Sequence, residues 1–518
     1  MTTTEIDTAV SLPRNSNQAL GIGQFACDFM RAGMGTPSDS VLHRTTMFFT
    51  DSVLCGLSAL ACRTNAPTVL RDEAMMYADD SGACCFGSTC RVKPEKAIAA
   101  NASAVREWDS NGTNFGFNPS LGHTAGEFGH NDFYAVPLAA AQVAGLDGAA
   151  ALRGMVCLDE IRGRLAEVFS LKSYRIDHVV HGAIASAAVY GAMLGATPQQ
   201  IESAIGMTVA HYIPWRAIRA GHQLSDSKGA SAAISTEVAV LSMLRSMRGF
   251  VGPADIFRNP EAIWRQFEPT DGDSPFDLVL SHSGDDFAVM GMHFKLGLYE
   301  HQSAGALQGL IDLLMQNPEI LAEPDALSEI TITAYQPAFG IIGDPAKRDP
   351  HTRQSADHSM VYIVSTMLRK AYEIFGEGKT VADGNDAWWK TLMLAPIDYG
   401  VEALHDPKTR SLMETIRFEH GGPEYDERYP DGIPTSISIT LEGGRTFESG
   451  LIMYPSGHAR NTTCDLEDIL AHKADLLGRI SMDDAASTID RCNTIGALKV
   501  DEVADLMDFT IAERDSVD

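Results

Sequence analysis

One segment of this chain, residues 179–196, carries small side chains on nearly every side. Its sequence is VVHGAIASAAVYGAMLGA, mostly alanine, glycine and valine, without Asp, Glu, Lys or Arg. Small side chains let helix backbones approach closely, so a helix of this composition needs other helices packed around it. The segment therefore predicts a central buried helix inside a large helical core.

Apolar residues keep a helical spacing over much of the rest of the chain. Thr197-Pro198 starts the next helix with Pro at its first position, and Lys228 opens an Ala-rich helix that stops at Gly249. The segments predicted as helices are 43–62, 149–169, 198–211, 228–249, 355–375 and 464–480.

Two segments in the second half alternate apolar and polar residues with the period of a strand. Residues 328–336 (SEITITAYQ) predict a strand with one wet face, and residues 435–454 predict a hairpin that turns at Gly443-Gly444. Helices beside an antiparallel sheet form an α+β domain. We therefore predict a mostly α protein: a large all-helical domain at 1–275 and 456–518, and a smaller α+β lid domain at 276–455. The cleft between the two is the expected ligand site.

Composition limits the partners of the protein. The chain has 518 residues and a net charge of −28, which disfavours nucleic acid as a partner. It has no apolar run long enough to span a membrane, and its polar N-terminus predicts a cytoplasmic protein. Nine cysteines without a CxxC motif indicate buried, reduced thiols, and a metal site at Cys84, Cys85 and Cys90 is the weaker alternative.

The loop at 106–132 is the strongest candidate for a reaction centre. It is rich in glycine and contains Asp109, Thr113, His123, Glu127 and His130. Imidazole exchanges protons near neutral pH, and a neighbouring carboxylate sets its tautomer. Asp109 and either His130 or His123 are therefore candidates for proton transfer, although turn-forming roles would also suit an Asp and a His in a loop.

Further polar groups follow this loop. Asp177-His178 with His181 predicts an acid/base or substrate-binding histidine, a metal pair, or a helix cap with a core histidine. Lys228 at a helix start opposes the helix dipole, which suggests a carboxylate-binding role; a solvated lysine paired with Asp226 is the alternative. Arg216 and Arg219 are spaced to hold a second carboxylate.

Several enzyme classes lack their motifs here. The chain has no GxSxG, P-loop, HExxH or dinucleotide-binding glycine motif, which disfavours serine hydrolases, NTPases, zincins and Rossmann dehydrogenases. Histidines, cysteines and acids do not form a three-ligand spacing, so we expect neither a metal nor a cofactor.

These motifs resemble the 2-methylcitrate dehydratase (MmgE/PrpD) family, which also holds cis-aconitate decarboxylase and iminodisuccinate epimerase. The similar segments are NASAVREWDSNGT, GHNDFYAVPLAAA, LSDSKGASAA, FKLGLYEHQSA, DPHTRQSADHSMVYIV and YPSGHARNT. The resemblance implies a metal-free enzyme, usually a homodimer, with a helical domain and an α+β lid. The implied site contains Asp109, Thr113, His130, His178, Lys228, Lys295 and His301.

The chain departs from the family pattern in its histidine loop. An insertion carries His123 and Glu127, and Asn-Gly-Thr at 111–113 replaces the second Asp of the dehydratase motif. His130 precedes a helix that is similar to the family's, so we prefer His130 over His123 as the catalytic histidine.

We therefore expect a hydro-lyase of propionate metabolism that abstracts an α-proton from a di- or tricarboxylate such as 2-methylcitrate. Expected catalytic residues are Asp109, His130, His178, Lys228 and Lys295, and expected substrate-binding residues are Thr113, Arg219, His301 and His123. Decarboxylation, epimerisation and a non-catalytic binding protein are the alternatives.

Overall fold

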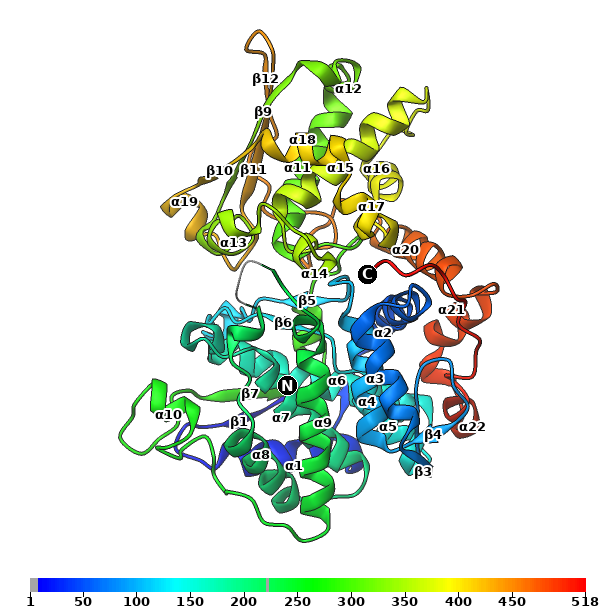
Figure 1. The fold of residues 1–518 in the computed structure, drawn as a ribbon. Helices are drawn as coiled ribbons and strands as arrows, with labels where there is room; N and C mark the ends of the chain where they lie inside the picture. The colour runs from blue at the N-terminus through cyan, green and yellow to red at the C-terminus, as the bar shows by residue number, and fades with distance from the viewer. Residues whose placement is uncertain (1–7, 220–222) are drawn as a thin grey trace, which may run out of the picture.

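The computed structural model describes residues 8–219 and 223–518. Residues 1–7 and 220–222, inside the predicted domain 1–275, lie outside the described residues. As predicted, the described chain is mostly helical, and its strands form only small sheets. Helices α1–α9 gather in the lower part of Figure 1, and α11–α19 with a four-stranded sheet form the upper part. We call these the helical part and the sheet-containing part.

Helix α7 (Val179–Met193) is the central buried helix that its composition predicted. All of its residues are buried, and it packs against α1, α5, α6, α8 and α9. A Cβ at Gly182 would lie 2.0 Å from Phe133 Cζ, so glycine is what lets the Phe133 ring lie against this helix. The other helices of the helical part are α1 (Gln18–Arg31), α2 (Asp39–Ala61), α3 (Asn65–Met75), α4 (Pro94–Arg106), α5 (Ala135–Ala144), α6 (Gly148–Val168), α8 (Pro198–His211), α9 (Ser227–Met247) and α10 (Ile263–Phe267).

Helix starts follow their capping residues. Helix α8 has Pro198 in its first turn, as predicted, and Thr197 and Gln200 form a capping box. Helix α9 begins one residue before Lys228. Among the described residues, no single helix is long and apolar enough to cross a membrane; α2 and α3 pass that test only together, across a 90° bend.

The sheet-containing part holds both predicted strand segments in one sheet. The strand order is β10-β9-β11-β12, with β9 antiparallel to β11 and parallel to β10. Gly443 and Gly444 turn the predicted hairpin with φ of 85° and 83°, although its second strand is shorter than predicted. Edge strand β10 was not predicted. The strands are β9 (Leu327–Ala334), β10 (Ile416–His420), β11 (Thr435–Leu441) and β12 (Thr446–Glu448).

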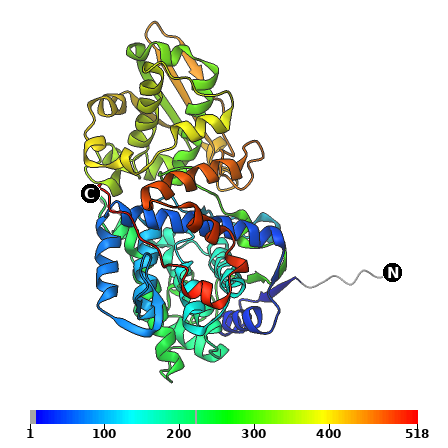
Figure 2. The same ribbon diagram turned by 90° about the vertical axis from the view of Figure 1, so that its right-hand side faces the viewer.

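Helices surround this sheet and then lead the chain back to the helical part. Helix α11 packs on β11. Helix α20 packs on α2, and Figure 2 shows α20–α22 in red and orange along the helical part. These helices are α11 (Ala304–Gln316), α12 (Glu319–Ala322), α13 (Gln336–Ile341), α14 (Arg353–Ala356), α15 (Met360–Gly376), α16 (Asn385–Leu392), α17 (Val401–Leu404), α18 (Pro407–Glu414), α19 (Pro423–Asp426), α20 (Leu466–Ser481), α21 (Ala486–Asn493) and α22 (Val500–Ala504).

Short strand pairs lie outside this four-stranded sheet, and none of them was predicted. β7 runs antiparallel to β1, which ties residues 278–281 to the N-terminal segment. β5 pairs with β6 and brings Thr113 opposite His130. The pairs are β1 (Ala9–Leu12) with β7 (Leu278–Ser281), β2 (Thr36–Pro37) with β8 (Ser283–Gly284), β3 (Ala78–Cys84) with β4 (Arg91–Val92), and β5 (Thr113–Asn114) with β6 (Gly129–His130).

We predict that Gly182→Ala lowers the free energy of unfolding by about 1–3 kcal/mol, because the added methyl group would overlap the Phe133 ring. Urea titration followed by circular dichroism measures the change. Gly376→Ala is the matched control, since Gly376 also lies in a helix and a Cβ there would meet no atom within 4 Å. Equal effects of the two substitutions would contradict the packing explanation.

Candidate active site

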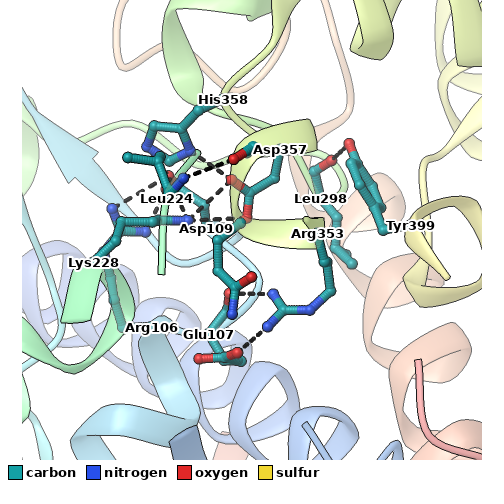
Figure 3. Close-up of polar contacts among 12 residues, drawn as sticks. Arg106, Glu107, Asp109, Leu224, Lys228, Leu298, Arg353, Asp357, His358 and Tyr399 are labelled. Atoms are coloured by element: carbon teal, nitrogen blue, oxygen red, sulfur yellow. Dashed lines mark hydrogen bonds and ion pairs between the residues drawn. The ribbon is translucent and has the colours of Figure 1, made fainter. Parts of the chain in front are cut away.

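Asp109 lies at the centre of a buried charge cluster just after helix α4. Its backbone has a φ of 51°, in the left-handed region that few non-glycine residues adopt. Its carboxylate is fully buried and contacts both Arg106 and the ammonium of Lys295. Nε2 of His358 lies 3.0 Å from Oδ2, and Nζ of Lys228 lies 3.9 Å from the same oxygen. Figure 3 shows most of this cluster.

Asp357 and His358 complete the cluster from the sheet-containing part. Both carboxylate oxygens of Asp357 lie 3.0 Å from Nζ of Lys228. His358 bridges the two carboxylates, because its Nδ1 lies 2.5 Å from Asp357 and its Nε2 faces Asp109. Neither residue was among the predicted site residues. An Asp-His pair directly before the N-cap residue Ser359 was the available signal.

The electrostatics of this cluster keep its carboxylates ionised. Burial opposes the charge on Asp109, but Arg106, Lys295, His358 and Lys228 outweigh burial and hold its pKa well below the usual value. Burial likewise disfavours the charged form of Asp357, and Lys228 and His358 reverse this to lower its pKa. Asp109 is therefore an anion whose oxygens already face cations, which makes it a weak proton acceptor.

A cavity of about 50 Å³ lies beside this cluster, between the two parts of the molecule. On this measure one water molecule needs roughly 10–15 Å³, so the cavity holds a few waters and no tricarboxylate. Its lining comprises Arg106, Asp109, Thr113, Phe115, Phe128, His130, His178, Arg216, Arg219, Glu300, Gln302, Ile342, Lys347 and His358.

The predicted site residues lie at different depths around this cavity. Those that line it are Asp109, Thr113, His130, His178 and Arg219. Lys228 and Lys295 are fully buried against Asp109, so the alternative of a solvated Lys228 paired with Asp226 is wrong. His301 is buried against the Phe115 ring, at 5.5 Å between centroids. His123 lies away from the lining, with Nδ1 3.4 Å from Glu167.

His178 offers a lone pair at the cavity. Its Nδ1 lies 3.4 Å from Asp177, whose carboxylate is paired with Arg219. Burial disfavours the charge on Asp177, but Arg219 and His178 hold the pKa of this carboxyl well below its usual value. An ionised Asp177 attracts the Nδ1 proton, which leaves Nε2 as an acceptor, and within residues 8–219 and 223–518 this atom has no hydrogen-bond partner. Burial lowers the pKa of His178, so its imidazole is neutral at pH 7.

His130 lies next to His178, with 5.1 Å between the ring centroids. Its Nε2 lies 3.4 Å from Nη2 of Arg106. A guanidinium can only donate, so Nε2 accepts and the proton of the neutral ring is on Nδ1. Burial, with help from Arg106 and Lys295, lowers the pKa of His130.

Two cations at the cavity remain available for an anionic ligand. Arg216 and Lys347 line it, and neither makes an ion pair with a residue that the structure describes. Arg219, predicted to work together with Arg216, instead holds Asp177. Burial lowers the pKa of both Arg216 and Lys347, which indicates incompletely compensated cations that an anionic ligand would stabilise.

The side chains that the structure describes offer few ligands for a metal ion. In the described part of the chain, the only group that could hold an ion is Asp109, Asp357 and His358, whose ligand atoms lie within 4.8 Å of one another. Arg106, Lys228 and Lys295 contact the same carboxylates, so this group is already neutralised. The residues of the alternative metal sites at His178–His181 and at Cys84–Cys90 are not part of any such three-ligand group, and the cysteines are free thiols.

Lys473 on α20 supports the backbone of the site, a role that was not predicted from the sequence. Its buried ammonium donates to the carbonyl oxygens of Ser110 and Lys295, each at 2.8 Å, and lies 2.7 Å from Asp51. One side chain therefore holds the residue after Asp109, the backbone of Lys295, and helix α2.

We predict that Lys473→Met lowers the free energy of unfolding by about 3–5 kcal/mol, because it leaves Asp51 buried without a counterion. Arg479→Met on the same helix removes an exposed pair with Asp475 and should cost about 0–1 kcal/mol. Guanidinium titrations of both variants give these values. A Lys473→Met protein as stable as the Arg479→Met protein would contradict this stabilising role of Lys473.

Several known proteins are similar in sequence to a large part of this chain. A family model, the MmgE/PrpD N-terminal domain, matches residues 24–274. The mitochondrial 2-methylcitrate dehydratase of Yarrowia lipolytica is 26% identical over 369 residues, which cover 68% of this chain and 64% of that protein. The chain thus spans just under two thirds of the length of that relative.

Two other relatives carry related names. The 2-methylcitrate dehydratase of Escherichia coli K12 is 24% identical over 423 residues, covering 79% of this chain and 80% of that protein. The alkylcitrate dehydratase phiI of a fungal species is 24% identical over 302 residues, covering 58% and 56%. With the match to the N-terminal domain, these similarities show that the chain belongs to the MmgE/PrpD family.

Proposed function

We propose that this protein is a hydro-lyase that removes water from a di- or tricarboxylate such as 2-methylcitrate. One observation carries this proposal: a single cavity is lined by the neutral imidazole of His178, whose Nε2 can accept a proton, and by the cations Arg216 and Lys347. The relatives named 2-methylcitrate dehydratase and alkylcitrate dehydratase support the same reaction type. A place in propionate metabolism, a homodimer and a cytoplasmic location remain predictions.

The cations at the cavity recognise the substrate and stabilise the charge that develops on it. Arg216 and Lys347 hold carboxylate groups. When the α-proton leaves, the adjacent carboxylate takes on aci-carboxylate character, and fixed positive charges beside it lower the barrier. The neighbouring Arg219 and Arg106 also line the cavity, and Asp177 and Asp109 hold these two cations in position before the substrate arrives.

His178 is the base in this proposal. Its Nε2 takes the carbon-bound proton, and Asp177 stabilises the imidazolium that results. His130 presents its Nδ1–H to a substrate oxygen. Asp109 holds Arg106, Lys228 and Lys295 in position and does not itself transfer a proton, because its pKa is too low. The reaction then needs no metal ion.

The sheet-containing part acts as a lid in this proposal. The cavity is lined from both parts and is too small for a tricarboxylate, so the two parts must separate to admit one. Because β7 pairs with β1, we place the start of the lid near helix α11 and not at residue 276. The amide of Leu224 donates to Ser355 Oγ across the two parts, and its hydrogen exchange should slow when tricarboxylate binds.

Product analysis tests the reaction. The protein is incubated with 2-methylcitrate, citrate, cis-aconitate and iminodisuccinate in D₂O, with and without EDTA, and followed by NMR. We expect an unsaturated tricarboxylate and water from 2-methylcitrate, with no effect of EDTA. Release of CO₂ from cis-aconitate, or deuterium incorporation without water loss from iminodisuccinate, would replace the proposal with a decarboxylase or an epimerase. Activity that requires a divalent ion would contradict the metal-free mechanism.

Single substitutions test the assignment of the histidines. We predict that His178→Gln and His130→Ala each reduce turnover by about 10²- to 10⁴-fold, the usual contribution of a positioned proton-transfer group. His123→Ala should change turnover by less than about tenfold, because His123 contacts Glu167 outside the cavity. Steady-state kinetics with 2-methylcitrate measures all three. A larger loss for His123→Ala than for His130→Ala would place the catalytic histidine in the inserted loop.

A further inference from the structure

Loss of hydroxide from a substrate at neutral pH needs a proton donor, and the predicted site residues do not supply one. Asp109 is ionised, and His130 and His178 are neutral bases whose pKa burial has lowered. A donor must line the cavity, carry a proton near pH 7, and not be held by an ion pair.

Glu300 lies on the cavity and has these properties. It precedes the short helix His301–Ser303, and its backbone amide donates to the carbonyl oxygen of Asp357 at 2.9 Å. Its Oε2 accepts from the amide of Gln302 at 2.8 Å, which fixes the carboxyl group. No cation of the described residues forms an ion pair with it, although the cavity wall on which it lies also carries Lys347. Glu300 was not among the residues predicted from the sequence.

The surroundings of Glu300 favour its protonated form. Burial raises the pKa of Glu300 and the charge of Asp109 adds to this, while Lys295 and Lys347 oppose it, with a result of about 7. Glu300 therefore keeps its proton to a higher pH than an ordinary carboxyl group does. The titratable groups around it are Asp109, Lys295, Lys347, Tyr335 and Tyr429.

We infer that Glu300 is the general acid of the elimination, a role that rests on the proposed hydro-lyase function. His178 Nε2 takes the α-proton, and the electron pair of the C–H bond becomes the second bond of the new C=C. The C–O bond breaks, and its electron pair stays on oxygen. That oxygen takes the proton of Glu300 and leaves as water. Glu300 ends as a carboxylate and His178 as an imidazolium, and proton exchange with solvent restores both.

Kinetics of matched variants as a function of pH test this role. For the wild type we expect kcat with 2-methylcitrate to fall as pH rises through about 7, because the acid loses its proton. Glu300→Gln should reduce kcat by about 10²- to 10⁴-fold and abolish this fall of kcat at higher pH, which we call the alkaline limb. Glu300→Asp, which keeps a carboxyl group, should retain the limb and part of the activity.

Glu127→Gln is the matched control. Glu127 is buried, and burial raises the pKa of its carboxyl to about 7, as it does for Glu300. Glu127 does not line the cavity, however, and accepts from the amides of Phe128 and Lys172. Its substitution should leave the alkaline limb in place. Thermal unfolding of each variant separates a folding defect from a chemical one.

Lys347→Met tests the other proton-bearing group on the cavity. It should raise KM and leave the alkaline limb, since we assign Lys347 to carboxylate binding. An alkaline limb lost in Lys347→Met and kept in Glu300→Gln would overturn the assignment of Glu300, as would full activity of Glu300→Gln. A wild-type protein that releases no water from any of these substrates would instead refute the proposed function, whatever the variants do.

Discussion

The contact between the Asp109 carboxylate and the cations around it is the interaction on which the rest of the site depends. Arg106 comes from the end of helix α4, Lys228 from the start of α9, and Lys295 from the connection before α11. Burying any of these cations alone would cost several kcal/mol. Their convergence on one carboxylate makes the burial tolerable, and it explains why Asp109 keeps a left-handed backbone that most residues avoid.

The same cluster joins the two parts of the molecule. Asp357 and His358 bring a second carboxylate and a bridging imidazole from the sheet-containing part, and Arg353, four residues earlier, pairs with Glu107 beside Asp109. Opening the cavity by moving this part would separate charges that neutralise each other only when it is in place. An anionic substrate can compensate for that separation, because its carboxylates would meet the exposed cations. Under the proposed function, substrate charge and closure of the lid are therefore coupled.

The sequence predicted what depends on local pattern. Helix α7, the start of α8 at Pro198 and the hairpin at Gly443-Gly444 follow from spacing and turn residues within a few positions, and the structure has them. Asp109 and His130 were predicted from the polar, glycine-rich loop at 106–132, and His178 from its place between Asp177 and His181; the structure puts all three on the cavity. Two-residue pairs such as β5 with β6 carry too few residues to show a period.

Residues whose role depends on a distant partner were not predictable in this way. The role of Asp357 depends on its contact with Lys228, which lies 129 positions away in the sequence. Glu300 is an ordinary acidic residue until the fold places it on the same cavity as Asp109. Lys473 lies in a helix with many charged residues, and nothing in that pattern separates it from its exposed neighbours.

The position of Lys473 late in the chain has a consequence for the order in which the protein is made. A ribosome that has produced the whole helical part and the four-stranded sheet has not yet delivered helix α20. Until it does, Asp51 lacks its counterion, and the carbonyl groups of Ser110 and Lys295 lack their shared donor. The nascent chain can therefore contain every residue that lines the cavity and still lack the ammonium group of Lys473, so the candidate site gains this support only after helix α20 has been made.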